Sequence, residues 1–226
     1  MIKLVIYDLD GTLIDSKRDI AAATNYALAQ LKFPELSVDD ICRYVGYGLE
    51  QLLESALGKV SRTHADLSSE DMRRAVEFYK DYYSKHLLDE TILYPGVGEV
   101  LDKFSKHGIA QAVLTNKSEV FAHQILRAFG VDHYFFEVAG GDRWETRKPA
   151  AEPVIKVMEL AKSKTDETVL VGDSDIDIEA GRNAGVKTIA MTYGFQPAGQ
   201  IQKSQPDFIL DRFSDLLLCP IFGCAE

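Results

Sequence analysis

Apolar residues along this chain fall into short continuous runs, separated by longer stretches in which they recur at helical spacing. Such runs are typical of buried parallel strands, and helical spacing indicates helices that cover the sheet. The runs predict strands at residues 2–7, 110–114, 135–138, 168–171, 187–191 and 208–210. The intervening stretches predict helices that end before a glycine, at residues 97–107, 118–129 and 176–184. We therefore predict an α/β fold with a doubly wound parallel sheet and helices on both faces, and we expect Ser118 to cap its helix.

Residues 17–87 break this alternation. The stretch has no convincing strand, but it has helical patterns at residues 19–31, 49–57 and 70–87. Breaks at Phe33-Pro34 and Gly58-Lys59 separate these patterns. We therefore predict a chain of two parts: an α/β core formed by residues 1–16 and 88–226, and an all-helical insertion formed by residues 17–87.

The composition is that of an ordinary globular protein. The chain has 226 residues, of which 46% are hydrophobic and 27% are charged, so it has enough apolar material for a sizeable core. Its net charge of −10 disfavours binding to nucleic acid or to an anionic membrane surface. An anionic substrate would need local cations in its site. The sequence leaves both a monomer and a homodimer open.

Three cysteines, Cys42, Cys219 and Cys224, are scattered and odd in number. Their spacing matches neither a disulfide framework nor a zinc site, so we expect free thiols in a reducing cytosol. The first residues lack a signal-peptide pattern, and no apolar run is long enough to span a bilayer. The sequence thus predicts a cytoplasmic protein without a membrane partner.

The first predicted strand ends on two carboxylates, Asp8 and Asp10, followed by Gly11 and Thr12. In an extended chain, residues two apart lie on the same side, so these like charges repel each other. A divalent metal is the simplest cation that would favour such an arrangement. Gly11 permits the tight backbone that a ligand needs when it approaches the loop. The alternative is an ordinary acidic turn, since Asp and Gly are common turn residues.

Further polar loops are placed where they can join this one. Thr115-Asn116-Lys117 and Gly172–Asp177 each follow a predicted strand, and Arg147-Lys148-Pro149 precedes a helix that we expect to start near Pro153. In a doubly wound sheet, ligands bind beyond the carboxyl ends of the strands, so these loops are expected to meet.

Each of these loops also has a structural explanation that involves no ligand. Thr115-Asn116 could cap the next helix, and Lys148 alone is most often a solvated surface lysine. Asp173 and Asp177 could be a capping acid and a favourable charge in the first helical turn. The combination of acid, hydroxyl, lysine and acid at one set of strand ends favours a site over these explanations.

Together, these segments resemble the four motifs of the haloacid dehalogenase-like hydrolase superfamily, and within it the phosphoglycolate phosphatase-like proteins. The matching segments are Asp8-Leu9-Asp10-Gly11-Thr12, Leu114-Thr115-Asn116, Lys148-Pro149 and Gly172-Asp173-Ser174-x-x-Asp177. The helical insertion resembles the first cap type of the superfamily. The subfamily resemblance rests on Asp8–Ser16, Val45-Gly46-Tyr47-Gly48, Tyr94-Pro95-Gly96-Val97, Thr115-Asn116-Lys117, Gly140-Gly141-Asp142 and Gly172–Gly185. One departure is Ala151, which stands where such sequences usually carry a second proline.

The resemblance implies a Mg²⁺-dependent phosphatase that hydrolyses a small phosphate monoester through an aspartyl-phosphate, with 2-phosphoglycolate as the best guess. It implies that Asp8 is the nucleophile and Asp10 the acid/base. The implied Mg²⁺ ligands are the Asp8 carboxylate, the Asp10 backbone carbonyl and Asp173, with Ser174 and Asp177 orienting them. The implied phosphate-binding residues are Thr115 and Lys148, joined by Gly11 and Asn116 as backbone donors. Candidate selectors of the leaving group in the insertion are Arg43 and Tyr47.

Several alternatives keep this chemistry and change the substrate: a sugar phosphatase, an inorganic pyrophosphatase or a beta-phosphoglucomutase-like enzyme. The mutase is less favoured, because Gly48-Leu49-Glu50 stands where such enzymes usually present a cap arginine. A non-catalytic binding protein of the same fold is a further alternative. A binding protein of this kind would lack at least one of the four principal site residues. All four are present here: Asp8, Asp10, Lys148 and Asp173.

Overall fold

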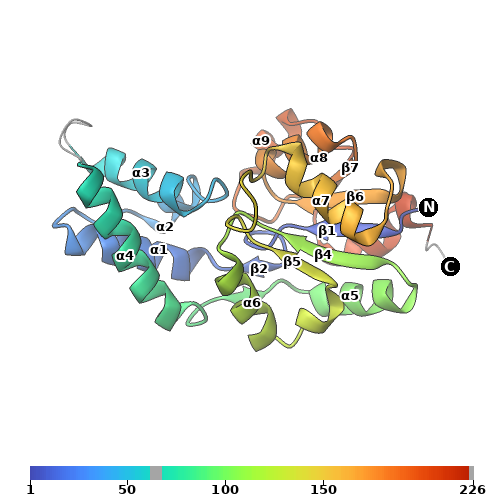
Figure 1. Ribbon diagram of the computed structural model, residues 1–226, viewed down its shortest axis with the longest axis horizontal. Helices are drawn as coiled ribbons and strands as arrows, with labels where there is room; N and C mark the ends of the chain where they lie inside the picture. Colours follow the sequence, from blue (N-terminus) through green and yellow to red (C-terminus); the bar gives the residue numbers. More distant parts are fainter. Residues whose placement is uncertain (62–67, 224–226) are drawn as a thin grey trace. The chain divides into compact units, whose positions relative to one another are not determined.

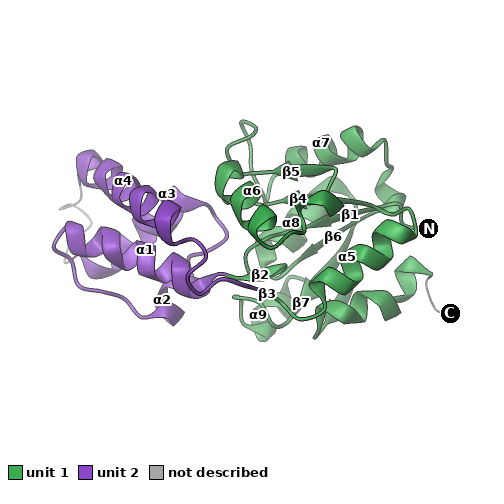
Figure 2. Ribbon diagram, turned by 90° about the horizontal axis from the view of Figure 1, so that it is seen from below, with its two compact units in different colours: residues 1–15, 93–226 green, residues 16–92 purple. Residues whose placement is uncertain are grey.

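The structure is a computed structural model, which describes residues 1–61 and 68–223. Its chain divides into two compact units, which Figure 2 shows in different colours. We call Met1–Asp15 together with Leu93–Glu226 the core unit, and Ser16–Ile92 the helical unit. The helical unit is thus inserted, in sequence, within the core unit.

A six-stranded parallel sheet forms the centre of the core unit, with the strand order β5-β4-β1-β6-β7-β8. Its strands are β1 (Leu4–Tyr7), β4 (Ala110–Leu114), β5 (Glu137–Ala139), β6 (Thr168–Gly172), β7 (Lys187–Met191) and β8 (Phe208–Leu210). The predicted α/β fold with a doubly wound parallel sheet is confirmed. The prediction for β5 began too early, because Asp132–Tyr134 form a 3₁₀ turn and Phe135 packs edge-on against Tyr7.

Helices cover both faces of this sheet. Figure 1 shows α5 (Val97–Lys106) and α6 (Glu119–Ala128) on one side, and α7 (Ala151–Ala161) and α8 (Asp175–Ala184) on the other. A short helix that the sequence analysis missed, α9 (Ala198–Lys203), follows β7. Its six residues are too few to show helical periodicity.

Side chains along β1 point alternately to the two faces of the sheet, so this strand packs against buried residues on both faces. Leu4 and Ile6 belong to a buried cluster that includes Val154 and Val157 of α7. Tyr7 packs on the opposite face, against the rings of Phe135 and Phe213. Its hydroxyl donates to Oε1 of the Gln111 side chain at 3.0 Å, so this buried polar group is satisfied.

The predicted N-cap position of α6 is confirmed, but the capping hydrogen bond comes from a residue other than Ser118. Ser118 is the N-cap residue, but its hydroxyl donates to Asp142 Oδ2 at 2.8 Å instead of capping the helix. The N–H of Glu119 donates to Asp142 Oδ1, also at 2.8 Å. The carboxylate of Asp142 therefore satisfies a backbone donor of the first turn. Local sequence could not show this, because Asp142 comes from the loop after β5.

The described part of the chain ends in two 3₁₀ helices, η4 (Phe213–Leu218) and η5 (Pro220–Phe222), and Phe213, Leu216 and Phe222 are buried. Cys42 and Cys219 are free thiols, and Cys224 lies outside the described residues. Among the described residues, no helix combines the length and the apolar character that crossing a membrane would require.

The helical unit consists of α1 (Lys17–Gln30), α2 (Val38–Cys42), α3 (Leu49–Val60) and α4 (Ser69–His86). Its buried side chains include Ile20 and Leu28 of α1, Leu53 of α3 and Tyr79 of α4. A capping box between Ser68 and Asp71 begins α4. The sequence predicted α1, α3 and α4, but missed α2, whose five residues are too short for a periodic pattern.

The helical unit extends to Ile92, past the boundary at residue 87 that we expected. The buried carboxylate of Asp19 in α1 explains the difference. It accepts hydrogen bonds from the N–H groups of Glu90 and Thr91 at 2.8–3.1 Å, and from the Thr91 hydroxyl at 2.6 Å. The flanking segments β2 (Ile14–Asp15) and β3 (Ile92–Leu93) pair as a two-stranded sheet. Two-residue strands leave no pattern in a sequence.

We predict that Asp19→Ala destabilises the protein, because it leaves the backbone donor of Glu90 and the buried donors of Thr91 without an acceptor. Each unsatisfied buried group costs roughly 1–3 kcal/mol, so the free energy of unfolding should fall by at least that amount. Urea unfolding followed by circular dichroism measures it. Asp81→Ala, which removes an exposed carboxylate paired with Lys85 on α4, is the control and should have a much smaller effect. Equal effects of the two substitutions would contradict the role of Asp19.

Candidate active site

Parallel pairing brings the polar loops of the core unit to one edge of the sheet. β1 lies between β4 and β6, and Tyr7 is in register with Val113 and Val171. The pairing continues past the end of β1, because the N–H of Asp8 donates to the Val171 carbonyl at 2.9 Å. Thr115, which follows β4, donates its N–H to the carbonyl of the last residue of β5 at 3.0 Å. Asp8, Thr115 and the residues after β6 therefore leave the sheet together.

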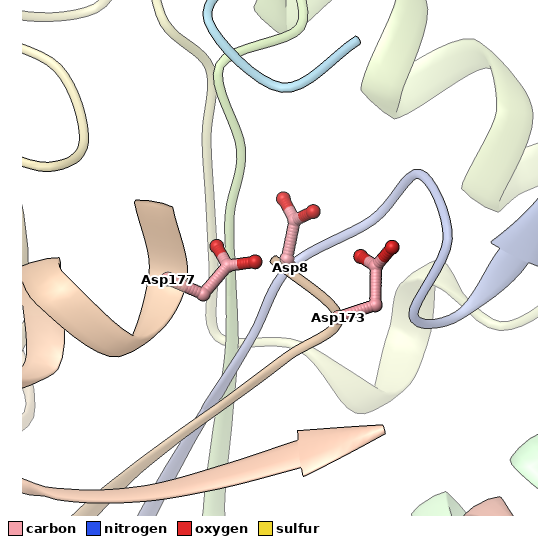
Figure 3. A group of neighbouring side chains, drawn as sticks. All are labelled: Asp8, Asp173 and Asp177. Carbon is pink, nitrogen blue, oxygen red and sulfur yellow. The ribbon is translucent and has the colours of Figure 1, made fainter. Parts of the chain in front are cut away.

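Three carboxylates gather at this edge. One oxygen each of Asp8, Asp173 and Asp177 lies within 4.8 Å of the others, and all three residues are buried. Figure 3 shows the carboxylates of Asp8 and Asp173 pointing the same way, while that of Asp177 points toward Asp8. Asp8 thus forms one acidic cluster with two residues that lie 165 and 169 positions further along the chain. Such a concentration of buried negative charge requires cations close by.

Lys148 supplies one of these cations. Its Nζ lies 2.8 Å from Asp8 Oδ1 and 2.6 Å from Asp177 Oδ1. The residue is 3% exposed, so the alternative of a solvated surface lysine is wrong. Two side-chain amides fix its loop: Asn116 donates to the Lys148 carbonyl and Asn183 to the Pro149 carbonyl, both at 2.8 Å. Lys148 is therefore held between two carboxylates by groups from three separate segments.

Burial and mutual charge change the protonation of this cluster. Burial raises the pKa of Asp8 to about 6; Lys148 opposes this shift and the Asp177 carboxylate reinforces it. Burial, with the carboxylates of Asp177 and Asp8, also raises the pKa of Asp173 well above its ordinary range. Burial alone would lower the pKa of Lys148, but the carboxylates of Asp177 and Asp8 outweigh it and raise that pKa. Lys148 is therefore charged at neutral pH.

Two glycines, one in the loop after β1 and one in the loop after β7, lie against Asp173. A Cβ at Gly11, whose φ is +86°, would lie 2.3 Å from Asp173 Oδ2, and one at Gly194 would lie 2.2 Å from Asp173 Cβ. The Thr12 hydroxyl donates to Oδ1 at 3.1 Å, and the N–H of Phe195 donates to Oδ2 at 2.7 Å. Only glycine therefore fits on either side of this carboxylate, and both of its oxygens are oriented.

The two carboxylate oxygens of Asp177 have different partners. The N–H and hydroxyl of Ser174 donate to its Oδ2 at 3.2 and 2.6 Å, which forms the capping box of α8. Its Oδ1 accepts from Lys148. The interpretation of Asp177 as an acid in the first helical turn is confirmed. Its second oxygen contacts Lys148, and its role in a site stays a prediction.

The donor set of the acidic cluster fits a hard divalent cation. Its members are carboxylate oxygens, and three carboxylates against one lysine leave an excess of negative charge. Each of the three carboxylates offers one oxygen to such a cation, and each also accepts hydrogen bonds from neighbouring groups of the site.

The model of the haloacid dehalogenase-like hydrolase family matches residues 5–191 of this chain. The chain belongs to this family. It is 37% identical over 216 residues to a phosphoglycolate phosphatase of Vibrio parahaemolyticus, covering 96% of this chain and 95% of that protein. It is 34% identical over 219 residues to a phosphoglycolate phosphatase of Aquifex aeolicus, covering 95% of each.

A solved structure has the same fold as this haloacid dehalogenase-like hydrolase. The crystal structure of a predicted phosphoglycolate phosphatase from Haemophilus somnus superposes with a TM-score of 0.91 at 32% sequence identity. It covers 96% of this chain and 97% of that chain. The similarity thus includes both the core and the helical unit in each case, and the resemblance read from the motifs is confirmed. The chain is accordingly a phosphoric monoester hydrolase.

Two features of the hydrolase site escaped the sequence analysis. Lys117 lies 2.8 and 3.0 Å from the two carboxylate oxygens of Asp10, although it carried no expected role. Gly194 and Phe195 enclose Asp173 from the loop after β7. A signal for the second was present, because this loop also follows the carboxyl end of a strand of the doubly wound sheet.

The segment 143–146, which the motifs left without a role, supports the Lys148 loop. The Trp144 ring packs against the core, with the Arg143 guanidinium and the Lys156 ammonium 5.6 and 5.5 Å from its centroid. The Thr146 hydroxyl donates to Glu152 Oε2 at 2.7 Å. This bond connects the residues before Lys148 to the first turn of α7, which anchors the loop from both ends.

The two candidate selectors, Arg43 and Tyr47, belong to the helical unit. Both side chains are exposed, Tyr47 by 45%. Between and after them, Gly46 and Gly48 have φ values of +113° and +96°, so this turn depends on glycine. Selection of the substrate by Arg43 and Tyr47 stays a prediction.

The raised pKa of Asp8 predicts a pH-dependent stability in metal-free protein. Its pKa of about 6 exceeds the ordinary value of 3.8, so between these values the folded protein retains a proton that the unfolded chain has lost. The contribution of Asp8 to the free energy of unfolding therefore falls as the pH rises from about 4 to about 6. We expect Asp8→Asn to gain stability relative to wild type across this range.

Urea unfolding in EDTA at closely spaced pH values measures this difference. The matched control is Asp102→Asn, which removes an exposed carboxylate paired with Lys106 on α5. Parallel pH curves for Asp8→Asn and wild type would show that Asp8 titrates alike in the folded and unfolded states.

Proposed function

We propose that this haloacid dehalogenase-like hydrolase is a Mg²⁺-dependent phosphatase that acts on a small phosphate monoester, with 2-phosphoglycolate as its preferred substrate, through an aspartyl-phosphate. The observation that carries this proposal is the placement of Lys148 between Asp8 and Asp177, beside Asp173. The similarity to phosphoglycolate phosphatases over nearly the whole chain supports the substrate.

In the proposed mechanism, Asp8 is the nucleophile. Lys148 holds its Oδ1, so the carboxylate has a fixed orientation and Oδ2 attacks phosphorus. The Oδ2–P bond forms as the bond from phosphorus to the leaving alkoxide breaks, and Asp10 gives the alkoxide a proton. Asp10 then takes a proton from water, whose oxygen attacks phosphorus and releases phosphate from Asp8.

The positive groups of the site bind the phosphoryl oxygens. We assign this role to the Lys148 ammonium and the Thr115 hydroxyl, with Asn116 as a backbone donor. The expected backbone donor at Gly11 is not retained, because its N–H already donates to the Ile14 carbonyl at 2.9 Å. Charge grows on these oxygens as phosphoryl transfer proceeds, so donors placed beforehand stabilise the transition state. The carboxylate pairing keeps Lys148 charged and in position before substrate arrives.

We assign Mg²⁺ to the Asp8 carboxylate, the Asp10 backbone carbonyl and Asp173, with Ser174 and Asp177 orienting the ligands. When bound, Mg²⁺ neutralises charge on the phosphoryl group and on the carboxylates. Gly11 and Gly194 hold Asp173 in one orientation, which suits a small cation that demands regular geometry. We also assign selection of the leaving group to Arg43 and Tyr47 of the helical unit.

We predict that Asp8→Asn lowers kcat by at least about 10³-fold, because the amide cannot form the aspartyl-phosphate. Initial rates of phosphate release measure this on a panel that holds 2-phosphoglycolate, sugar phosphates and pyrophosphate, with Mg²⁺ and with chelator. Wild-type preference for 2-phosphoglycolate supports the proposed substrate, and preference for another compound identifies a sugar phosphatase or a pyrophosphatase. Unchanged turnover in Asp8→Asn, with the fold preserved, would contradict the mechanism.

A second prediction concerns the metal alone. Mg²⁺ should raise the melting temperature of the wild-type protein, because it binds the folded chain and not the unfolded one. Asp173→Asn should remove most of this rise, since it withdraws an oriented anionic oxygen from the proposed site. Differential scanning calorimetry over a range of Mg²⁺ concentrations measures the effect. Asp166→Asn, in an exposed turn before β6, is the control, and an equal Mg²⁺ effect in both variants would place the ion elsewhere.

A further inference from the structure

Lys117 is an enclosed cation of the core unit that the mechanism above does not use. Its Nζ lies 2.8 Å from Oδ1 and 3.0 Å from Oδ2 of Asp10. The two side chains are only 8% and 10% exposed. The residues are 107 positions apart in the chain, so their pairing is decided by the tertiary structure.

The backbone of Lys117 is held on both sides. Its N–H donates to the Thr115 hydroxyl at 3.2 Å, and its carbonyl accepts from the N–H of Gly141 at 2.9 Å. The backbone of the Asp10 loop is held as well, because the N–H of Gly11 donates to the Ile14 carbonyl at 2.9 Å. The ion pair therefore joins two loops whose backbones are already fixed, and it determines where the Asp10 carboxylate points.

Buried Lys148 and part-buried Lys117 contact different carboxylates. Lys148 contacts Asp8 and Asp177, whereas Lys117 contacts Asp10 through both carboxylate oxygens. Removing two charges from water is costly, so an enclosed ion pair is weak evidence for a contribution to stability. Its clearest effect is geometric, because contact with both oxygens restricts rotation of the carboxylate.

We propose that Lys117 is the positioning residue of Asp10: it holds the carboxylate in the orientation from which Asp10 transfers protons. This inference rests on the proposed function, in which Asp10 is the acid/base. Proton transfer requires the reacting heavy atoms to lie within about 2.6–3.2 Å of each other. A displacement of about 1 Å costs on the order of 10²-fold in rate, so the orientation of one carboxylate matters.

The test is a double-mutant cycle between Lys117→Met and Asp10→Asn, with a substrate that the wild type hydrolyses. Methionine keeps much of the length and volume of lysine and removes its charge. Lys117→Met should lower kcat by about 10- to 100-fold and change KM by less than about 3-fold. In the Asp10→Asn background it should change kcat by less than about 2-fold, because Lys117 acts through Asp10.

Lys103→Met is the matched control, since Lys103 is an exposed lysine of α5 that pairs with Glu99 at 2.8 Å. It should leave kcat and KM unchanged. Thermal melting shows whether each variant is folded. If Lys117→Met does not fold, Lys117→Arg replaces it: arginine keeps the charge on a longer, planar group, and it should lower kcat without raising KM.

Three results would overturn the positioning role while leaving the phosphatase intact. A rise in KM at unchanged kcat would mean that Lys117 binds the substrate itself. An equal loss of kcat in both backgrounds would mean that it acts independently of Asp10. Full kcat and KM in Lys117→Met would mean that the pair has no part in turnover. Failure of the wild type to hydrolyse any ester is a separate outcome, which overturns the proposed function and this inference with it.

Discussion

The ammonium of Lys148 between Asp8 and Asp177 is the interaction on which the rest of the site depends. Without a buried cation, the carboxylates at the strand ends would repel one another in a poorly solvated place. With it, Asp8 has one oxygen held, Asp177 joins the cluster to the start of α8, and negative charge remains for a divalent cation. The two asparagine amides and the segment 143–146 all contribute to keeping this lysine in place.

Two further constraints complete the arrangement. Parallel pairing of β1 with β4 and β6 makes all three strands end at one edge, so short loops carry the polar residues to a common point. Glycines then let backbone approach where side chains could not, at Gly11 and Gly194 on either side of Asp173. The sheet thus provides the position and the glycines provide the close contact. Neither would assemble a site without the other.

Much of this was readable from the sequence, because the fold and the motifs are local signals. Apolar runs of strand length and helices ending at glycine indicated the α/β core, and the motifs indicated the family and the residues of the site. The errors occurred where the deciding contact is distant. Asp142 takes over a capping role expected of Ser118, and Asp19 draws Glu90 and Thr91 into the helical unit. Two-residue strands and five-residue helices were missed because they are shorter than the periods that identify them.

The sequence by itself determined the class of fold, the presence of an inserted helical part and the identity of the charged residues. These follow from hydrophobic spacing and from residue types at fixed offsets, which need no knowledge of distant neighbours. Only the tertiary structure decided which charges pair. It assigned Lys148 to Asp8 and Asp177, and Lys117 to Asp10. The physical reason is that Coulombic and hydrogen-bond contacts depend on separations of about 3 Å, which folding sets between residues that are 29 to 140 positions apart in these pairs.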